Sequence, residues 1–112
     1  MQLQFADTTL QHVAESRVRS DSHFGSHDGA LFRQRLSELL AASNLAIAGS
    51  VPNLGLRPVR SHPGKFVVRL RARLRLVIEV ADVPPRIDAN GEPELARIEA
   101  IRILGLEECD ES

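Results

Sequence analysis

A strictly alternating pattern of apolar and polar positions runs through residues 65–80 and predicts β-structure. Every even-numbered position from Phe66 to Val80 is apolar, whereas four of the odd-numbered positions are arginines. Because successive side chains on a strand point to opposite faces, this period of two indicates strand rather than helix. The stretch exceeds the usual strand length of about 3–10 residues, so we expect it to fold back as a hairpin near residues 71–73.

The arginine positions favour one register for this hairpin. A hairpin centred on Ala72 pairs Arg71 with Arg73. It also pairs Arg69 with Arg75, and all four arginines then share one face. A one-residue slip would mix arginines with leucines on each face. Like charges directly opposite each other are destabilising. Two explanations of the arginine face stay open. Either it binds an anion, or its long side chains are solvated or covered by a partner protein.

The charges along the chain are segregated. No acidic residue occurs from Leu39 to Ile78, and seven of the fourteen basic residues lie between Arg57 and Arg75. From Glu79 to the C-terminus, ten acidic residues outnumber three arginines. The net charge of −1 therefore hides a local basic patch that attracts anions. The patch comprises Arg57, Arg60, Lys65, Arg69, Arg71, Arg73 and Arg75.

The first half of the chain predicts a short strand followed by two helices. Gln2–Ala6 alternates like a strand or the lead-in to a helix, and Asp7 is a candidate N-cap for a helix over Thr8–Arg19. Ser20–Gly29 is polar and rich in turn formers, so we expect a loop there. Ala30–Ala42 has an apolar stripe at helical spacing. The two helices are expected to form an antiparallel hairpin on one face of the sheet.

Two longer segments are expected to be loops. Leu45–Gly64 contains three prolines and three glycines, and long connections in small domains are often functional. It carries His62, which could act as an acid or base near neutral pH or simply face solvent. Asp82–Glu94 is a second polar loop. Ile98–Leu106 fits a helical stripe slightly better than one face of a strand.

Length and composition are those of one ordinary globular domain, residues 1–112. Apolar residues make up 43% and charged residues 26% of the chain, as in typical globular proteins. No apolar run is long enough to cross a membrane, and the N-terminus lacks the features of a signal peptide, so we expect a cytoplasmic protein. The single cysteine, Cys109, excludes an internal disulfide. His23, His27 and Asp28 match no zinc-site spacing, and we expect no metal.

Several segments of the second half occur in an order that is typical of one family. They are residues 39–44 (Leu-Leu-Ala-Ala-Ser-Asn), 74–79 (Leu-Arg-Leu-Val-Ile-Glu), the loop 84–91, and 100–104 (Ala-Ile-Arg-Ile-Leu). On this ordered set, residues 37–108 resemble the HigB-like toxins of the RelE/ParE superfamily. These proteins are the toxin halves of type II toxin–antitoxin pairs.

The resemblance implies an α+β fold of RelE type, in which an N-terminal strand and a two-helix hairpin pack on an antiparallel sheet. It also implies that Arg97–Glu107 is the last strand, against the slight helical preference of its spacing. Many relatives cleave messenger RNA on the ribosome without a metal or other cofactor. The implied partners are the ribosome, mRNA and a cognate antitoxin, often a helix-turn-helix protein.

The resemblance also implies roles for the basic residues. Arg75 matches the arginine that relatives carry in the central strand, and Arg69 lies where relatives often place a polar or basic residue. These side chains would hold the phosphate and stabilise its developing charge, with His62 as the candidate acid or base. The remaining basic residues are expected to contact phosphate: Arg57, Arg60, Lys65, Arg71 and Arg73.

The chain departs from the family at the end of the last strand. Relatives often carry a Tyr-His pair there, whereas this chain has Cys109-Asp110. A carboxylate beside a phosphate site repels the substrate, so this departure predicts weak cleavage or none. Two other functions stay open: a non-catalytic partner of an antitoxin, and a gyrase inhibitor of the ParE type that acts by protein contact.

Overall fold

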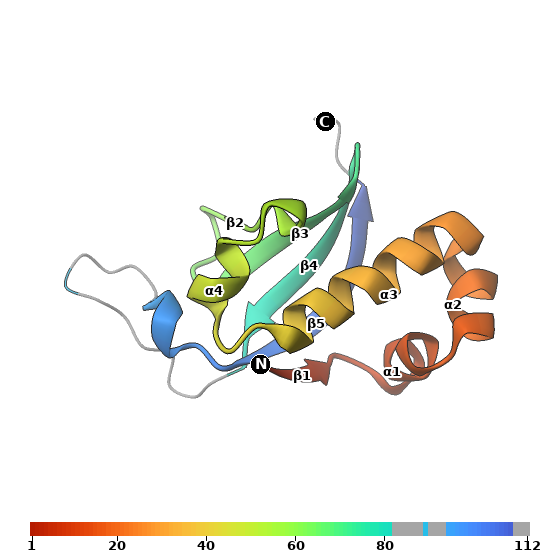
Figure 1. Cartoon of the computed structure of the whole chain (residues 1–112), viewed down its shortest axis with the longest axis horizontal. Coiled ribbons are helices and arrows are strands. Elements are labelled where there is room, and N and C mark those ends of the chain that lie inside the picture. The colour runs from red at the N-terminus through yellow and green to blue at the C-terminus, as the bar shows by residue number, and fades with distance from the viewer. Residues whose placement is uncertain (82–88, 90–93, 109–112) are drawn as a thin grey trace.

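The alternating stretch forms two central strands, as predicted. β3 (Lys65–Arg71) and β4 (Leu74–Val80) are antiparallel neighbours in a five-stranded sheet. The computed structural model describes residues 1–81, 89 and 94–108 (Figure 1). Around this hairpin the described elements are β1 (Gln2–Phe5), α1 (Thr8–Glu15), α2 (Arg17–Phe24), α3 (Ser26–Ala41), α4 (Leu45–Gly49), β2 (Arg57–Pro58) and β5 (Ala100–Glu108).

The sheet is mixed rather than antiparallel throughout. Its strand order is β1-β5-β4-β3-β2, and β1 pairs in parallel with β5. The other neighbouring pairs are antiparallel. The prediction of an α+β fold with an N-terminal strand is confirmed, and the predicted antiparallel sheet is confirmed for β2 to β5, whereas β1 joins it in parallel. The first strand of the chain lies at the sheet edge beside the last one, and Gln2 at its start is opposite Ala100 at the start of β5.

Three helices stand where the sequence predicted a two-helix hairpin and an intervening loop. Asp7 caps α1 as expected, since its carboxylate accepts a hydrogen bond from the backbone N–H of Leu10 at 2.7 Å. Ser16 ends α1 and caps a new helix, because its hydroxyl accepts from the backbone N–H of Arg19 at 3.2 Å. Gly25, at φ 89°, turns the chain between α2 and α3. Residues 20–29 are therefore mostly helical, and the loop prediction is wrong.

Close helix packing accounts for this departure. A Cβ atom on Gly29 of α3 would lie 2.8 Å from a carboxylate oxygen of Asp21 on α2, so only glycine permits this approach. Ser20 is fully buried, and its hydroxyl donates to the carbonyl oxygens of Val13 and Ser16 at 2.5 and 2.9 Å. The polar composition of α2 suggested a loop, but its polar side chains are either exposed or satisfied within this packing.

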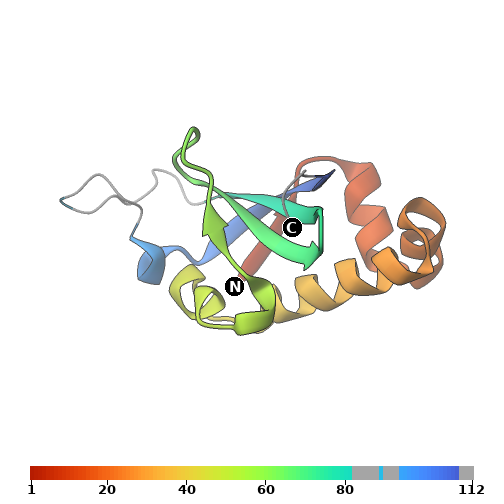
Figure 2. The same ribbon diagram turned by 90° about the horizontal axis from the view of Figure 1, so that it is seen from above.

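The hydrophobic core lies between the helices and one face of the sheet. Figure 2 shows α3 and α4 along one side of the sheet. Leucines of the hairpin point into the core as predicted: Leu70, Leu74 and Leu76 are buried. The other large, fully buried side chains are Phe32, Leu39, Leu45, Leu54, Val68, Ile78, Ile98, Ile101 and Ile103.

The last strand follows the family-based expectation rather than the helical spacing. β5 begins at Ala100, after a short 3-10 helix at Leu95–Arg97, and its pairing with β4 shifts between Val77 and Ile78. Gly105, at φ 143°, lies at this irregularity. Most of the expected loop 82–94 lies outside the described residues. Among the described residues, no helix is both long and apolar enough to cross a membrane.

Candidate nucleic-acid interface

Two arginines lie directly opposite each other on the sheet face that points away from α3. Arg69 of β3 pairs with Arg75 of β4, which confirms the predicted register at this position. Directly opposed side chains on a sheet are about 4.5–5.5 Å apart at Cβ. Neither guanidinium forms an ion pair within the described residues. The two side chains therefore concentrate positive charge at one point of the sheet.

We refer to the sheet face opposite α3 as the open face. Cross-strand pairing places on it the neighbours of Arg69 and Arg75 that share their side of the sheet. These neighbours are Arg57, Lys65, Val67, Val77, Glu79, Arg102 and Glu107.

The predicted pairing of Arg71 with Arg73 is wrong. Arg71 pairs with Leu74 instead, because a register shift between Arg69 and Arg71 interrupts the alternation. The turn consists of Ala72 and Arg73, and Arg73 adopts φ 67°, a left-handed conformation more common for glycine or asparagine. Two of the four expected arginines therefore do not extend the row formed by Arg69 and Arg75.

Arg71 is tied to the helical layer. Its Nε and a terminal nitrogen donate to the two carboxylate oxygens of Asp28 at 2.7 and 3.1 Å. The hydrogen bond from Arg71 lowers the pKa of the Asp28 carboxyl from its ordinary value of 3.8, although partial burial opposes this shift. The same bond raises the pKa of Arg71. A bidentate pair of this kind leaves little of the guanidinium for another anion.

The position of Arg69 is supported from both sides of its strand. Arg35, a buried residue of α3, donates from Nε to the carbonyl oxygen of Arg69 at 2.9 Å and from a terminal nitrogen to Glu38 at 2.6 Å. A Cβ atom on Gly55 would lie 3.1 Å from the Cβ of Arg69, so glycine allows the preceding loop to approach this side chain closely. The backbone under Arg69 is fixed while its guanidinium stays exposed.

A second row on the open face is largely apolar. Arg57 of β2 lies beside Val67, which lies beside Val77, which lies beside Gly105 of β5. Val77 is only 9% exposed although it lies on the face opposite α3. On the open face, a short row that includes Val67 and Val77 thus lies between two rows of charged residues.

A third row neutralises most of its own charge. Arg102 of β5 donates to Glu79 of β4 at 2.6 Å and to the side-chain oxygen of Gln4 on β1 at 3.5 Å. Lys65 lies opposite Glu79 but forms no ion pair with it. This end of the face holds an ion pair, whereas Arg69 and Arg75 form none within the described residues.

One carboxylate borders the arginine pair. Glu107 of β5 lies directly opposite Arg75, and the two form no ion pair. Sequence reasoning missed this residue because its place on the open face depends on the pairing of β4 with β5. It is the titratable acidic group that the register brings next to the arginine pair.

The candidate acid–base residue His62 lies at the other end of the sheet. It belongs to the loop between β2 and β3, where its Nδ1 is 2.9 Å from the hydroxyl of Ser61. With Lys65 and Glu79 it lines a shallow depression of about 390 Å³. Lys65 precedes Arg69 by four residues, or about 13 Å along a strand. The described structure therefore does not bring His62 together with Arg69 and Arg75.

The remaining expected site residues are dispersed. Arg60 is exposed in the same loop as His62, and Arg73 is exposed in the hairpin turn. Cys109 and Asp110 lie outside the described residues. Within the described part of the chain, no group of three or more histidine, cysteine or acidic side chains is arranged to hold a metal ion.

Comparison with known proteins adds no relative to this description. No family model matches the chain, and neither the curated proteins nor the solved structures contain a match.

Proposed function

We propose that the open face binds RNA through its phosphate groups and that the protein is a toxin of the RelE/ParE kind that inhibits translation. The observation that supports this most is the Arg69–Arg75 pair. The two arginines lie directly opposite each other on neighbouring strands and have no acidic ion-pair partner in the described chain. The folded protein tolerates the repulsion of this pair. A phosphate between the two guanidinium groups would replace repulsion with charge-assisted hydrogen bonds.

The neighbouring cations extend this surface. Arg57 lies one row away on β2, and Lys65 lies at the other end of β3, both without an ion-pair partner in the described residues. Arg60 adds a further exposed charge in the adjoining loop. Contacts of this kind bind the backbone of RNA without reading its sequence. In this proposal the ribosome supplies the context that selects the messenger.

Cleavage at this surface would use Glu107 together with the arginine pair and needs no metal. Glu107 accepts the proton of a ribose 2′-hydroxyl, whose oxygen attacks the adjacent phosphorus. The bond from phosphorus to the 5′-oxygen then breaks, and that oxygen takes a proton from water. Arg69 and Arg75 stabilise the charge that develops on the phosphate oxygens. The distance of His62 from this point makes Glu107 the better candidate base.

The apolar strip favours a second role for the same surface. Val67 and Val77 lie between Arg57 and the arginine pair. An amphipathic acidic segment of an antitoxin could place apolar side chains on the valines and carboxylates on the arginines. In that case the face is a protein-binding surface, and the chain needs no catalytic group.

Induced expression in cells tests the proposed function. We expect growth to stop and protein synthesis to fall before DNA replication does. The double substitution of Arg69 and Arg75 by alanine should abolish both effects. Arg71→Ala is the matched control, because Asp28 already occupies that guanidinium. Normal growth during expression of the parent chain would contradict the toxin proposal, and an earlier loss of replication would support the gyrase-inhibitor alternative.

Mapping mRNA 5′ ends after induction separates cleavage from binding. Glu107→Gln should reduce new 5′ ends while leaving RNA affinity equal or higher, because it removes a negative charge beside the phosphate. The paired substitutions Cys109→Tyr and Asp110→His, which restore the residues common in the resembling family, should increase cleavage. If induction of the parent chain and of these variants produces no new mRNA 5′ ends, the result would support a non-catalytic partner of an antitoxin.

A further inference from the structure

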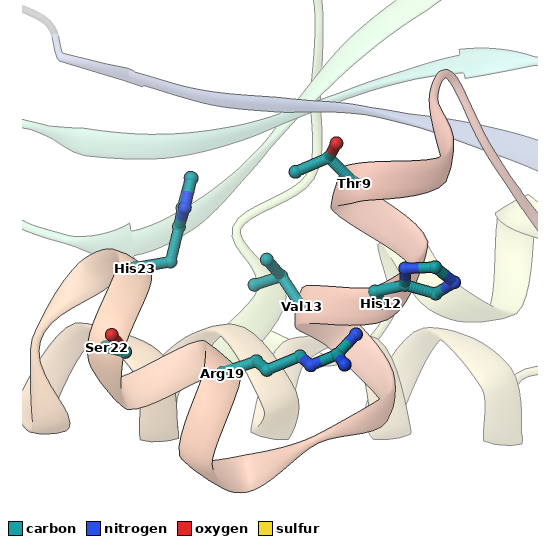
Figure 3. A pocket seen from close by; sticks show the side chains of 6 residues that line it. All are labelled: Thr9, His12, Val13, Arg19, Ser22 and His23. Carbon is teal, nitrogen blue, oxygen red and sulfur yellow. The ribbon is translucent and has the colours of Figure 1, made fainter.

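A second cluster of basic side chains lies away from the open face, between α1 and α2. Figure 3 shows these side chains around a depression of about 330 Å³. The lining combines three basic side chains, two hydroxyl groups and one valine. These residues are Thr9, His12, Val13, Arg19, Ser22 and His23.

No carboxylate of the described residues lines this depression. Arg19 forms no ion pair within the described residues, whereas Arg17, two positions earlier on the same helix, lies 3.9 Å from Asp21. In Figure 3 the Arg19 side chain extends from α2 toward the ring of His12 on α1. Basic groups from two helices thus approach each other around open space, and an anion placed there would contact both.

The junction of the two helices is fixed in place. The hydroxyl of Ser16 caps α2, and the buried hydroxyl of Ser20 bonds the last turns of α1. His23 lies edge-on to Phe24, with ring centroids 4.6 Å apart, and Phe24 packs against Phe32 of the core at 5.0 Å. The depression therefore has a defined shape before any ligand enters, which lowers the entropic cost of binding.

A second depression of about 280 Å³ adjoins the first. Thr9 and His23 line both, so the two meet at these residues. The second depression combines apolar and polar lining in about equal measure and reaches β5. Its remaining lining residues are Asp7, Leu10, Phe24, Leu104, Gly105 and Leu106. A ligand that spans both would carry an anionic group at one end and, at the other, a flat group with apolar faces and polar edges.

We propose that these adjoining depressions bind a nucleoside monophosphate, free or as the 5′ end of an RNA strand. The terminal phosphate contacts Arg19 and His12, with the hydroxyls of Thr9 and Ser22 as further hydrogen-bonding groups. A phosphate monoester carries about −1.5 to −2 charges at neutral pH and three accessible oxygens, which suits donors that come from two helices. The base occupies the second depression, with its faces beside Phe24 and Leu106 and its polar edge toward the polar part of the lining. This site is separate from the open face and does not rest on the proposed function.

Titration of the isotope-labelled protein with inorganic phosphate and with AMP tests the site. We expect saturable shifts of the backbone signals of α1 and α2, with AMP also shifting residues 104–106. Arg19→Gln should weaken binding of both at least about 10-fold, as for other charge-assisted hydrogen bonds. Arg17→Gln is the matched control and should bind as the parent does. His12→Gln should weaken binding, whereas the exposed His27→Gln should not.

Two short RNAs that differ only in a 5′-phosphate identify the source of the ligand. A tighter complex with the phosphorylated RNA, lost in Arg19→Gln, assigns the site to RNA ends. Binding of AMP without that gain assigns it to free nucleotides. The double variant Arg69→Ala, Arg75→Ala should still bind AMP, because the two sites are separate. AMP binding therefore tests this site even if the open face binds no RNA. Two outcomes would overturn the proposal. One is that AMP and phosphate shift no backbone signals of α1 and α2. The other is that the Arg17→Gln and Arg19→Gln variants lose AMP affinity equally while their circular dichroism is unchanged.

Discussion

Arg69 and Arg71 lie two residues apart on one strand, yet they serve opposite purposes. Arg71 holds both carboxylate oxygens of Asp28 and joins the hairpin to α3, whereas Arg69 faces Arg75 with no ion-pair partner in the described chain. The shift in register between them sends the two side chains to different surroundings. Residue type alone therefore does not separate a structural arginine from one that is open to a ligand.

A third arginine fixes the backbone position of Arg69 in the Arg69–Arg75 pair. Arg35 binds the backbone oxygen of Arg69 from the buried side of the sheet and also pairs with Glu38. Arginines on the helical side thus satisfy neighbouring groups and fix the strand. On the open face, Arg69 projects from that fixed strand and forms no ion pair within the described residues.

The largest expected effect comes from removing the open pair. Replacing Arg69 and Arg75 together by alanine should weaken binding to single-stranded RNA about 100-fold and reduce the slope of log affinity against log salt by about 2. The melting temperature should stay unchanged or rise, because the loss relieves repulsion. Filter binding at several salt concentrations measures the RNA affinity and its salt dependence, and thermal unfolding measures the melting temperature. Arg71→Ala should leave RNA affinity nearly unchanged. An equal loss of RNA affinity in the double variant and in Arg71→Ala would show that the arginine bound by Asp28 and the two arginines without ion pairs contribute alike.

Arg35→Met should destabilise the fold by about 2–3 kcal/mol. The substitution keeps most of the buried volume but leaves the Arg69 carbonyl oxygen and the Glu38 carboxylate without their donor. Urea unfolding measures the change. Arg17→Met, at an exposed position on α2, is the control and should change stability by less than about 0.5 kcal/mol. A similarly small change for Arg35→Met would show that Arg35 does not fix β3.

Arg73→Gly should stabilise the protein by about 1 kcal/mol. Arg73 has a positive φ of 67°, which costs a residue with a Cβ about 1–2 kcal/mol, partly offset by the greater chain entropy of glycine when unfolded. Urea unfolding measures the gain. RNA affinity should fall only slightly, because Arg73 lies in the turn rather than in the arginine row. A loss of stability would mean that the Arg73 side chain contributes more than its backbone strain costs.

The smallest expected effect concerns the tie between Asp28 and Arg71. Asp28→Asn should lower the melting temperature slightly at pH 7. The pKa of Asp28 is lowered in the folded state, so the ion pair stabilises the fold above the ordinary value of 3.8 and loses this contribution as the pH falls through the lower folded value. The difference between parent and variant should therefore shrink below about pH 3.8. A difference that persists at lower pH would point to a cause other than the charge of Asp28.

Local patterns in the sequence determined much of the secondary structure. The period of two identified the hairpin, its core-facing leucines and the pairing of Arg69 with Arg75. Asp7 identified the start of α1 through its capping preference. Each of these features depends on residues that are neighbours in the chain, so the sequence carries the signal directly.

Only the tertiary structure decided where the remaining charges point. Asp28 and Arg71 are 43 residues apart, and Arg35 and Arg69 are 34 apart, so no local pattern connects them. The helix break at Ser16 and the packing at Gly29 place His12 and Arg19 around one depression, although the sequence alone suggested one helix and a loop. Periodicity assigns a face to each position only while pairing is regular. A shift in register and the approach of distant elements override it, because burial and hydrogen bonding are satisfied in three dimensions.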